Sequence, residues 1–198
     1  HLSAEERNDL RRGLASIQSR GTGLLRFVQA YGSLTNLPPP QLATVSVAAL
    51  IGRIETLMRP ALEDEGIALE TVSVDRGLTI RVDSQQIEQV LINLLKNAIE
   101  ALDGWSTGRV VLRTERDDRG NVLIRVADNG PGVPDSLRSR IFEPFFTTRP
   151  GGTGLGLAVV SSVVQAHGGQ VRLEAEGPGA TFTLELPALR MDRESRHE

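Results

Sequence analysis

Apolar and polar positions in the first 40 residues predict a long helix followed by a rigid break. Positions spaced alternately by four and three form the seam of a helix that packs on partner helices, over residues 4–35, at Leu10, Leu14, Ile17, Gly21, Leu24, Val28 and Tyr31. Glycines within the segment weaken the helix by about 1 kcal/mol each relative to alanine. It therefore needs contacts with a dimer partner or, alternatively, with its own domain.

A proline run separates this helix from the rest of the chain. Pro38, Pro39 and Pro40 end the helix and form a stiff linker, which is the best domain boundary in the sequence. The next helix is predicted from Val47 to about Glu65. Its apolar face comprises Leu50, Ile54, Leu57 and Ala61, and Pro60 is expected to kink it or to split off its last turn. We divide the chain into residues 1–40, 41–189 and a polar tail, 190–198.

Alternating apolar residues farther along predict short strands interspersed with helices. The strands centre on residues 78–82, 110–114, 122–126, 171–175 and 182–186, and the helices span about 84–102 and 154–167. This order predicts an α/β fold: a two-layer α/β sandwich with a mixed sheet of about five strands against three helices, preceded by the long α-helix. Because Gly168 and Gly169 end the last helix, His167 is expected to be a helix terminus and not a catalytic base.

Two asparagines on the helix 84–102 suggest a metal–phosphate site. Asn93 and Asn97 are four residues apart and share a helix face with Glu100. Asparagine is a poor helix former, and two on one face are most often simply exposed. Amide oxygens can nevertheless bind Mg²⁺ when phosphates supply the other oxygen ligands.

Residues 126–133, VADNGPGV, place an aspartate where a strand ends. Asp128 can be an ordinary turn former, but its carboxylate can also accept a hydrogen bond from the exocyclic amine of adenine. Gly130 and Gly132 would let a flat ring approach the backbone.

Two further segments complete the set of candidate binding residues. The sequence FEPFFTTR, residues 142–149, contains three phenylalanines and suggests the apolar anchor of a loop. The sequence GGTGLGL, residues 151–157, leads into a helix, whose free N–H groups and dipole favour phosphate. It lacks the Gly-Lys-Ser/Thr of a Walker A motif.

These segments, in this order, resemble the catalytic domain of sensor histidine kinases, within the group that includes gyrase, heat-shock chaperone and mismatch-repair ATPases. The resemblance covers about residues 44–187: NLLKNA is similar to the N box, DNGPG and GTGLGL to the two glycine boxes, and FEPFFTT to the F box. The N and F boxes most resemble the nitrogen-regulation type. The resemblance implies the GHKL fold, ATP and Mg²⁺ as ligands, and a response regulator receiver domain as partner.

The resemblance also implies roles for individual residues. Asn97 should bind Mg²⁺, with Asn93 near the metal or phosphates, and Asp128 should bind adenine with Thr181 assisting through water. Residues from about 134 to 153 should form a mobile lid. The complete expected ATP-binding set is Asn93, Lys96, Asn97, Asp128, Gly130, Gly132, Thr147, Thr148, Arg149, Gly152, Thr153, Gly154, Leu155, Gly156, Leu157 and Thr181. Lys96 and Arg149 are candidates to neutralise phosphate charge. Glu100 occupies a position, three residues after Asn97, where many such kinases have a basic residue.

No histidine lies in the surroundings that the family's phosphoacceptor requires; the three present are His1, His167 and His197. We therefore expect the chain to bind Mg-ATP without phosphorylating itself, and the acceptor to lie on a helical hairpin that dimerises in the full-length protein. In relatives of the wider group a glutamate replaces Asn93 and activates water; asparagine is not a general base, which favours phosphoryl transfer over hydrolysis.

Composition narrows the class of protein. The formal net charge of −3 argues against a nucleic-acid binder, and the absence of cysteine excludes disulfides. No apolar run is long enough to cross a bilayer. The resemblance to sensor kinases implies a cytoplasmic location, with membrane attachment only through other segments. One alternative is a non-catalytic nucleotide sensor. The other is a serine kinase of the anti-sigma-factor kind, and the long helix predicted in the first 35 residues argues against this second alternative.

Overall fold

The computed structural model describes residues 37–75, 77–149, 152–174 and 178–187, together with the isolated positions 13, 18, 21 and 32. The helix predicted over residues 4–35 lies outside the described residues except at those four positions, as does the tail 190–198. Four helices and seven strands are described, in the order β1 (Ala43–Ser46), α2 (Val47–Asp64), β2 (Ala68–Ser73), β3 (Thr79–Val82), α3 (Ser84–Ala101), β4 (Arg109–Arg116), β5 (Val122–Asp128), α4 (Asp135–Arg138), α5 (Gly156–Ala166), β6 (Gln170–Leu173) and β7 (Thr181–Leu186).

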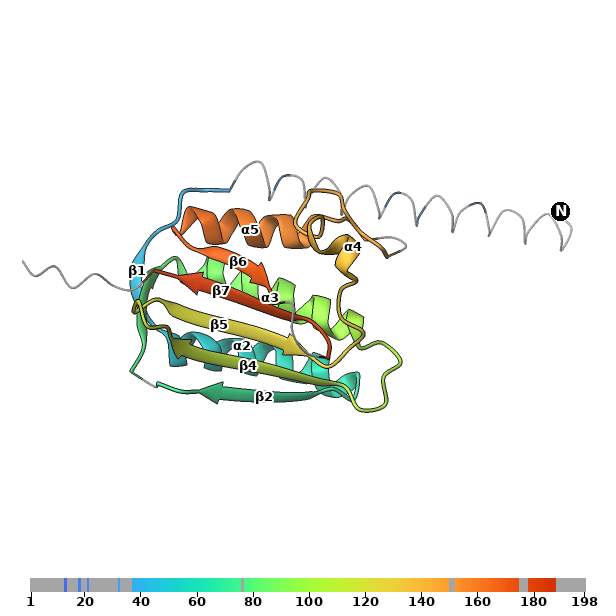
Figure 1. Cartoon of the computed structure of the whole chain (residues 1–198), viewed down its shortest axis with the longest axis horizontal. Helices are drawn as coiled ribbons and strands as arrows, with labels where there is room; N and C mark the ends of the chain where they lie inside the picture. The colour runs from blue at the N-terminus through green and yellow to red at the C-terminus, as the bar shows by residue number, and fades with distance from the viewer. Residues whose placement is uncertain are drawn as a thin grey trace, which may run out of the picture.

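Five strands form one mixed sheet in the order β2-β4-β5-β7-β6 (Figure 1). β2 runs parallel to β4, and the other three pairings are antiparallel. β1 and β3 pair antiparallel in a separate two-stranded sheet. The predicted strand at residues 78–82 is therefore present as β3, but it does not belong to the main sheet.

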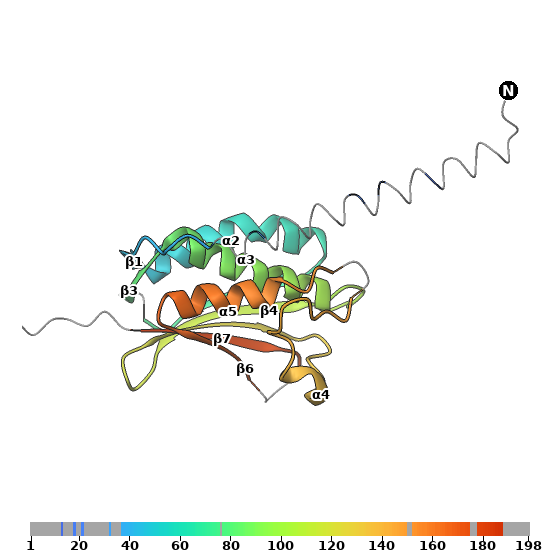
Figure 2. The same cartoon turned by 90° about the horizontal axis from the view of Figure 1, so that it is seen from above.

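Helices α2, α3 and α5 cover one face of the main sheet, and the second view shows the two layers edge-on (Figure 2). The core between the layers consists of fully buried aliphatic side chains such as Leu50, Leu91, Leu94, Ile124 and Leu184. This arrangement confirms the predicted two-layer α/β sandwich.

Helix α2 shows how the buried face was partly mispredicted. The helix continues through Pro60 to Asp64 without losing its last turn. Its buried stripe passes from Ile54 to Met58 and Leu62, whereas Leu57 is 61% exposed. Leu57 and Met58 are three and four residues after Ile54, so both fit a helical repeat, and the side on which the sheet and α3 lie selects Met58.

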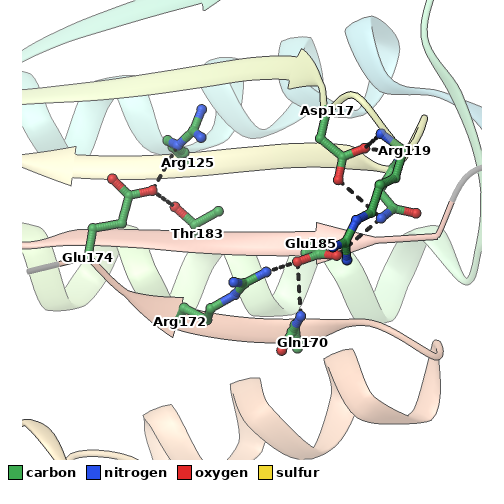
Figure 3. Close-up of polar contacts among 9 residues, drawn as sticks. Asp117, Arg119, Arg125, Gln170, Arg172, Glu174, Thr183 and Glu185 are labelled. Atoms are coloured by element: carbon green, nitrogen blue, oxygen red, sulfur yellow. Dashed lines mark hydrogen bonds and ion pairs between the residues drawn. The ribbon is translucent and has the colours of Figure 1, made fainter.

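The opposite face of the sheet is polar and held together by paired charges (Figure 3). Glu174 accepts hydrogen bonds from Arg125 of β5 and from the hydroxyl of Thr183 of β7. Glu185 of β7 accepts hydrogen bonds from Gln170 and Arg172 of β6. These contacts tie three neighbouring strands across an open face that has no covering helix in the described part of the chain.

The linker after the proline run is attached to the start of α3. Asp83 caps this helix, its Oδ1 accepting from the N–H groups of Gln85 and Gln86 at 3.1 and 3.2 Å. Its Oδ2 accepts from the N–H of Gln41 at 3.0 Å, and Gln86 Nε2 donates to the Pro38 carbonyl at 3.0 Å. No helix among the described residues combines the length and apolar character needed to cross a bilayer.

Candidate functional site

A cavity of about 370 Å³ opens between α3, the end of β5, the loop after α4 and the start of α5. Its polar side chains come mainly from α3 and from residues 147–153, and its apolar side chains mainly from residues 133–146 and from Ala180 and Phe182. The residues on its wall are Asn93, Lys96, Asn97, Glu100, Ala101, Asp128, Gly132, Val133, Pro134, Leu137, Ile141, Phe146, Thr147, Thr148, Arg149, Gly152, Thr153, Gly154, Gly156, Leu157, Ala180 and Phe182.

Asp128 is a buried carboxylate at the apolar end of this cavity, with only 8% of its surface exposed. Its Oδ1 accepts from the N–H groups of Gly130 at 2.9 Å and Ala180 at 3.2 Å. No described residue donates to Oδ2, which leaves that oxygen as an unused acceptor. Burial raises the pKa of Asp128, and the two N–H donors partly oppose that rise. The carboxylate is thus fixed in orientation with one oxygen available to a ligand.

The glycines around Asp128 also lie close to other protein atoms. A Cβ at Gly130 would stand 2.9 Å from Asp128 Oδ1, and one at Gly132 would stand 2.7 Å from the carbonyl oxygen of Gly179. Gly132 also has a φ of +71°, which disfavours other residues. Packing and backbone conformation therefore require glycine at position 132, whereas a side chain at position 130 would have to displace the Asp128 carboxylate.

Helix α3 presents Asn93, Lys96 and Asn97 to the cavity. The amide of Asn93 accepts from Gln89 Nε2 at 3.2 Å, whereas the amide of Asn97 has no hydrogen-bonding partner among the described residues. The described residues include no cluster of three or more histidine, cysteine or acidic side chains that could hold a metal by themselves. A free amide oxygen in a cavity fits Mg²⁺ that takes most of its ligands from phosphates and water.

The start of α5 forms the opposite wall. Leu155 occupies the N-cap and is fully buried, and no side chain caps the first turn within the described part of the chain. The first backbone N–H groups of the helix are therefore available to an anion. A Cβ at Gly156 would meet nothing within 4 Å, so the wall at this position is backbone beside open space.

The loop between α4 and α5 is anchored by its aromatic residues. The ring of Phe142 lies edge-on to that of Phe182 in β7, with centroids 6.3 Å apart. The guanidinium of Arg140 lies 4.5 Å above the centre of the Phe146 ring. Phe145 has a φ of +68°, and a Cβ at Gly154 would stand 2.4 Å from the Phe145 carbonyl carbon. The loop thus has the apolar anchor that the sequence suggested, and Gly154 permits its close return to α5.

Arg149, near the end of this loop, contacts α3. Its guanidinium forms an ion pair with Glu100 and donates to the Asn97 carbonyl at 3.3 Å. Burial lowers the pKa of Arg149, but an arginine starts so far above neutrality that the group remains a cation at physiological pH.

Thirteen of the sixteen predicted residues line the cavity. The three that do not are Gly130, Leu155 and Thr181. Leu155 is a core residue, and Ala180, the neighbour of Thr181, donates its N–H to Asp128. Sequence reasoning missed the apolar wall formed by residues such as Val133, Leu137, Ile141 and Phe182. The Val that follows DNGPG was a usable signal; the others come together only through the fold.

His167 lies away from the cavity, at the end of α5. Its Nδ1 lies 2.8 Å from the Val163 carbonyl, and its Nε2 accepts from the N–H of Asp83 at 3.1 Å. Both ring nitrogens are occupied by backbone partners and the side chain is buried, as expected for a residue with a structural role.

Comparison with known proteins supports this description. Residues 82–190 match the family of histidine kinase-, DNA gyrase B- and HSP90-like ATPases. Over 175 residues the chain is 35% identical to the sensory histidine kinase/phosphatase NtrB of Rhodobacter capsulatus, covering 83% of this chain and 48% of that protein. The chain therefore spans about half the length of this curated relative.

Solved structures agree. The nucleotide-free catalytic domain of histidine kinase ThkA superposes with a TM-score of 0.69 at 32% identity, covering 75% of this chain and 96% of that domain. Full-length ShkA in complex with AMPPNP gives 0.76 at 34% identity, over 95% and 40% of the two chains. ThkA in complex with the response regulator TrrA gives 0.75 at 27% identity, over 95% and 53%. The chain belongs to the histidine kinase-, DNA gyrase B- and HSP90-like ATPase family and contains the catalytic domain of a sensor histidine kinase of the nitrogen-regulation kind.

Proposed function

We propose that the cavity binds Mg-ATP and that the domain transfers the γ-phosphate to a phosphoacceptor histidine on a helical hairpin. The observation that carries this proposal is the arrangement of the cavity wall. A buried carboxylate with a free oxygen stands at its apolar end, and an unpartnered amide, two cations and an uncapped helix start stand at its polar end. Adenosine triphosphate has the matching distribution of groups, with a flat apolar base at one end and phosphates at the other.

In this proposal Asp128 recognises the base. Its Oδ2 accepts a hydrogen bond from the adenine amine, while Gly130 and Ala180 hold Oδ1. Guanine has a carbonyl at the equivalent position, and two acceptors facing each other would repel. The apolar side chains around Asp128 cover the faces of the ring.

The phosphates lie between α3 and the start of α5. Lys96 and Arg149 neutralise part of their charge, and the first N–H groups of α5 donate to their oxygens. Asn97, with Asn93 beside it, holds the Mg²⁺, which neutralises phosphate charge and orients the phosphates. The lid closes over the phosphates through Thr147, Thr148, Gly152 and Thr153.

The cavity is better suited to transfer than to hydrolysis. Its carboxylates, among the described residues, are Asp128 and Glu100. Asp128 is fixed at the end that we assign to the base, and Glu100 is paired with Arg149. Neither is free to activate water next to the γ-phosphate, and asparagine is not a base. A histidine nucleophile from another domain would supply the missing group.

We further propose that the full-length protein is a cytoplasmic or membrane-anchored homodimer in which residues 1–40 continue a dimerising hairpin. A response regulator receiver domain would then take the phosphate on an aspartate. The ThkA–TrrA complex supports this class of partner.

Two measurements test the proposal. Calorimetry with ATP and a non-hydrolysable analogue, with and without Mg²⁺, should show saturable binding that GTP does not reproduce. The chain mixed with a separately produced hairpin domain of a nitrogen-regulation kinase and labelled ATP should form acid-labile phosphohistidine on the hairpin. Absence of any binding would refute the proposed ligand; binding without transfer to any hairpin would favour a nucleotide sensor.

A further inference from the structure

Glu100, which forms an ion pair with Arg149, places a carboxylate in a cavity that, by the proposed function, binds a polyanion. Both residues are on the cavity wall, and Glu100 lies one helical turn after Asn97. A carboxylate here opposes phosphate binding by its own charge. Its position beside the phosphate end therefore calls for an explanation other than direct contact with the ligand.

The Glu100–Arg149 pair connects the loop 134–153, which is the lid of the proposed function, to α3. Arg149 donates to Glu100 and to the Asn97 carbonyl. Both contacts come from one side chain near the end of the loop 134–153 and reach the same turn of α3. The guanidinium of Arg149 thus determines where this part of the loop meets the helix.

Local contacts fix the backbone at Arg149 and leave its side chain to make this link. The N–H of Arg149 donates to Thr147 Oγ1 at 3.1 Å, and its carbonyl accepts from Gly152 at 3.2 Å. A Cβ at Gly152 would stand 2.6 Å from Thr147 Oγ1, so a larger residue there would have to displace the hydroxyl that holds the Arg149 N–H. The compact loop delivers the arginine side chain to the Asn97–Glu100 turn of α3.

Stability alone does not account for the pair. The side chains of Arg149 and Glu100 are 40% and 57% exposed, and exposed ion pairs contribute little to folding. What the pair does is to remove rotamer freedom from a long side chain before any ligand arrives. The guanidinium has five donors, so donors remain for a phosphate while Glu100 holds the group in place.

We propose that Glu100 is a positioning residue: it holds Arg149 against α3 beside Asn97, so that the lid, and not the helix, supplies a preorganised guanidinium to the phosphates of ATP. This inference rests on the proposed function of the cavity. It distinguishes Glu100 from a residue that merely repels the ligand, because its benefit must depend on Arg149.

The test is a double-mutant cycle on Mg-ATP affinity, measured by calorimetry for the wild-type chain and for Glu100→Ala, Arg149→Ala and the double variant. Arg149→Ala should weaken binding about tenfold, the scale of one charge-assisted contact. Glu100→Ala should weaken binding about threefold or more when Arg149 is present, and should strengthen it when Arg149 is absent. Glu100→Gln, which keeps the size of the side chain, should likewise weaken binding when Arg149 is present.

A rescue variant provides a second measurement. Its ATP affinity would not recover if Glu100 had only a structural role. In Glu100→Arg combined with Arg149→Ala, the guanidinium comes from α3 itself, and affinity should return to within about threefold of wild type. Glu88→Ala is the matched control, since Glu88 lies on the same helix, pairs with Arg53 at 2.7 Å and is not on the cavity wall; it should leave affinity unchanged.

The outcomes separate this inference from the proposed function. If wild-type protein does not bind Mg-ATP, the proposed function fails first. If it binds, but Glu100→Ala strengthens binding or leaves it unchanged while Arg149 is present, or if Arg149→Ala has no effect, the positioning role is overturned. Melting temperatures of all variants identify any that lose affinity by unfolding, and Glu100→Gln then decides the sign.

Discussion

Gly179 lies directly against the backbone of Asp128: a Cβ at Gly179 would stand 1.9 Å from the Asp128 carbonyl oxygen. Gly179 has a φ of +85°, in the region that disfavours side chains. Ala180, the next residue, donates its N–H to Asp128 Oδ1. The short turn before β7 thus sets both the position and the orientation of the Asp128 carboxylate at the apolar end of the cavity.

Gly179→Ala should therefore damage stability and binding together. The added methyl group must displace the backbone of Asp128, and we expect a loss of roughly 2 kcal/mol or more in the free energy of unfolding. Chemical denaturation measures this loss, and calorimetry should show weakened ATP binding. Gly52→Ala is the control: Gly52 lies in α2 with nothing within 4 Å of its would-be Cβ, so stability should rise slightly. Equal stability of the two variants would contradict the packing argument.

Asp128→Asn should weaken ATP binding by at least about tenfold and reduce the preference for ATP over GTP, because an amide donor would replace or compete with the acceptor that faces the adenine amine. Competition between the two nucleotides for the same sites measures the preference. An unchanged ratio of affinities would exclude Asp128 as the base-reading group.

The same substitution should not destabilise the free domain at neutral pH. Burial raises the pKa of Asp128, so the folded state binds a proton more readily than the unfolded state. The stability associated with this group is therefore greatest below its unfolded pKa of about 3.8 and is lost as the pH rises through the folded pKa. Removing the charge should leave the melting temperature at pH 7 equal or higher. A lower melting temperature would show that the charged form is favoured by contacts other than those described.

Asn97→Ala should reduce the dependence of ATP binding on Mg²⁺. Wild-type affinity should differ by about tenfold or more between Mg²⁺ and EDTA, and this ratio should fall to about threefold or less in the variant. Magnesium titrations at fixed ATP report the ratio. Asn93→Ala should have the smaller effect, because the Asn93 amide is already engaged by Gln89. The reverse order would exchange the roles of the two asparagines.

Asp83→Asn tests the attachment of the linker to α3. The N–H of Gln41 is the largest influence that lowers the pKa of Asp83, so the carboxylate stabilises the fold above about pH 3.8 and loses this effect as the pH falls through the lowered folded pKa. Asparagine can still cap the helix through one oxygen but cannot accept from Gln41 as well. We expect a loss of about 1 kcal/mol at pH 7 and a flatter acid limb of the stability curve. A parallel downward shift at every pH would contradict the assignment.

Motifs with fixed spacing made most of the cavity predictable. Asn93 and Asn97 share a helix face by geometry alone, and the glycine-rich start of α5 needs no tertiary information. β2 was missed because it is an edge strand whose residues are mostly exposed, so it lacks an apolar alternation. Its parallel pairing with β4 depends on a partner 41 residues away in sequence, as Ala68 and Arg109 show.

The roles of individual glycines were less predictable than their presence. Gly130 and Gly132 were expected to let a ring approach, and that stays a prediction; their neighbours within the protein, Asp128 from the same strand end and Gly179 from a distant turn, were not expected. Likewise the N–H of Ala180 that donates to Asp128 was not expected, because side-chain chemistry in the sequence gives no sign of a backbone donor. Contacts made by main-chain atoms depend on the fold and leave little trace in residue type.

The attachment of the linker at Asp83 and Gln86 has a mechanical consequence. Helix α3 is an unbroken rod of 18 residues, about 27 Å long, that begins where the incoming polypeptide is tied and carries Asn93 and Asn97 in its later turns. A force on the chain ahead of Gln41 would therefore reach, among other elements, the helix that carries these two amides. The point where the chain enters the domain and the Asn93–Asn97 side of the cavity are thus connected by one stiff helix.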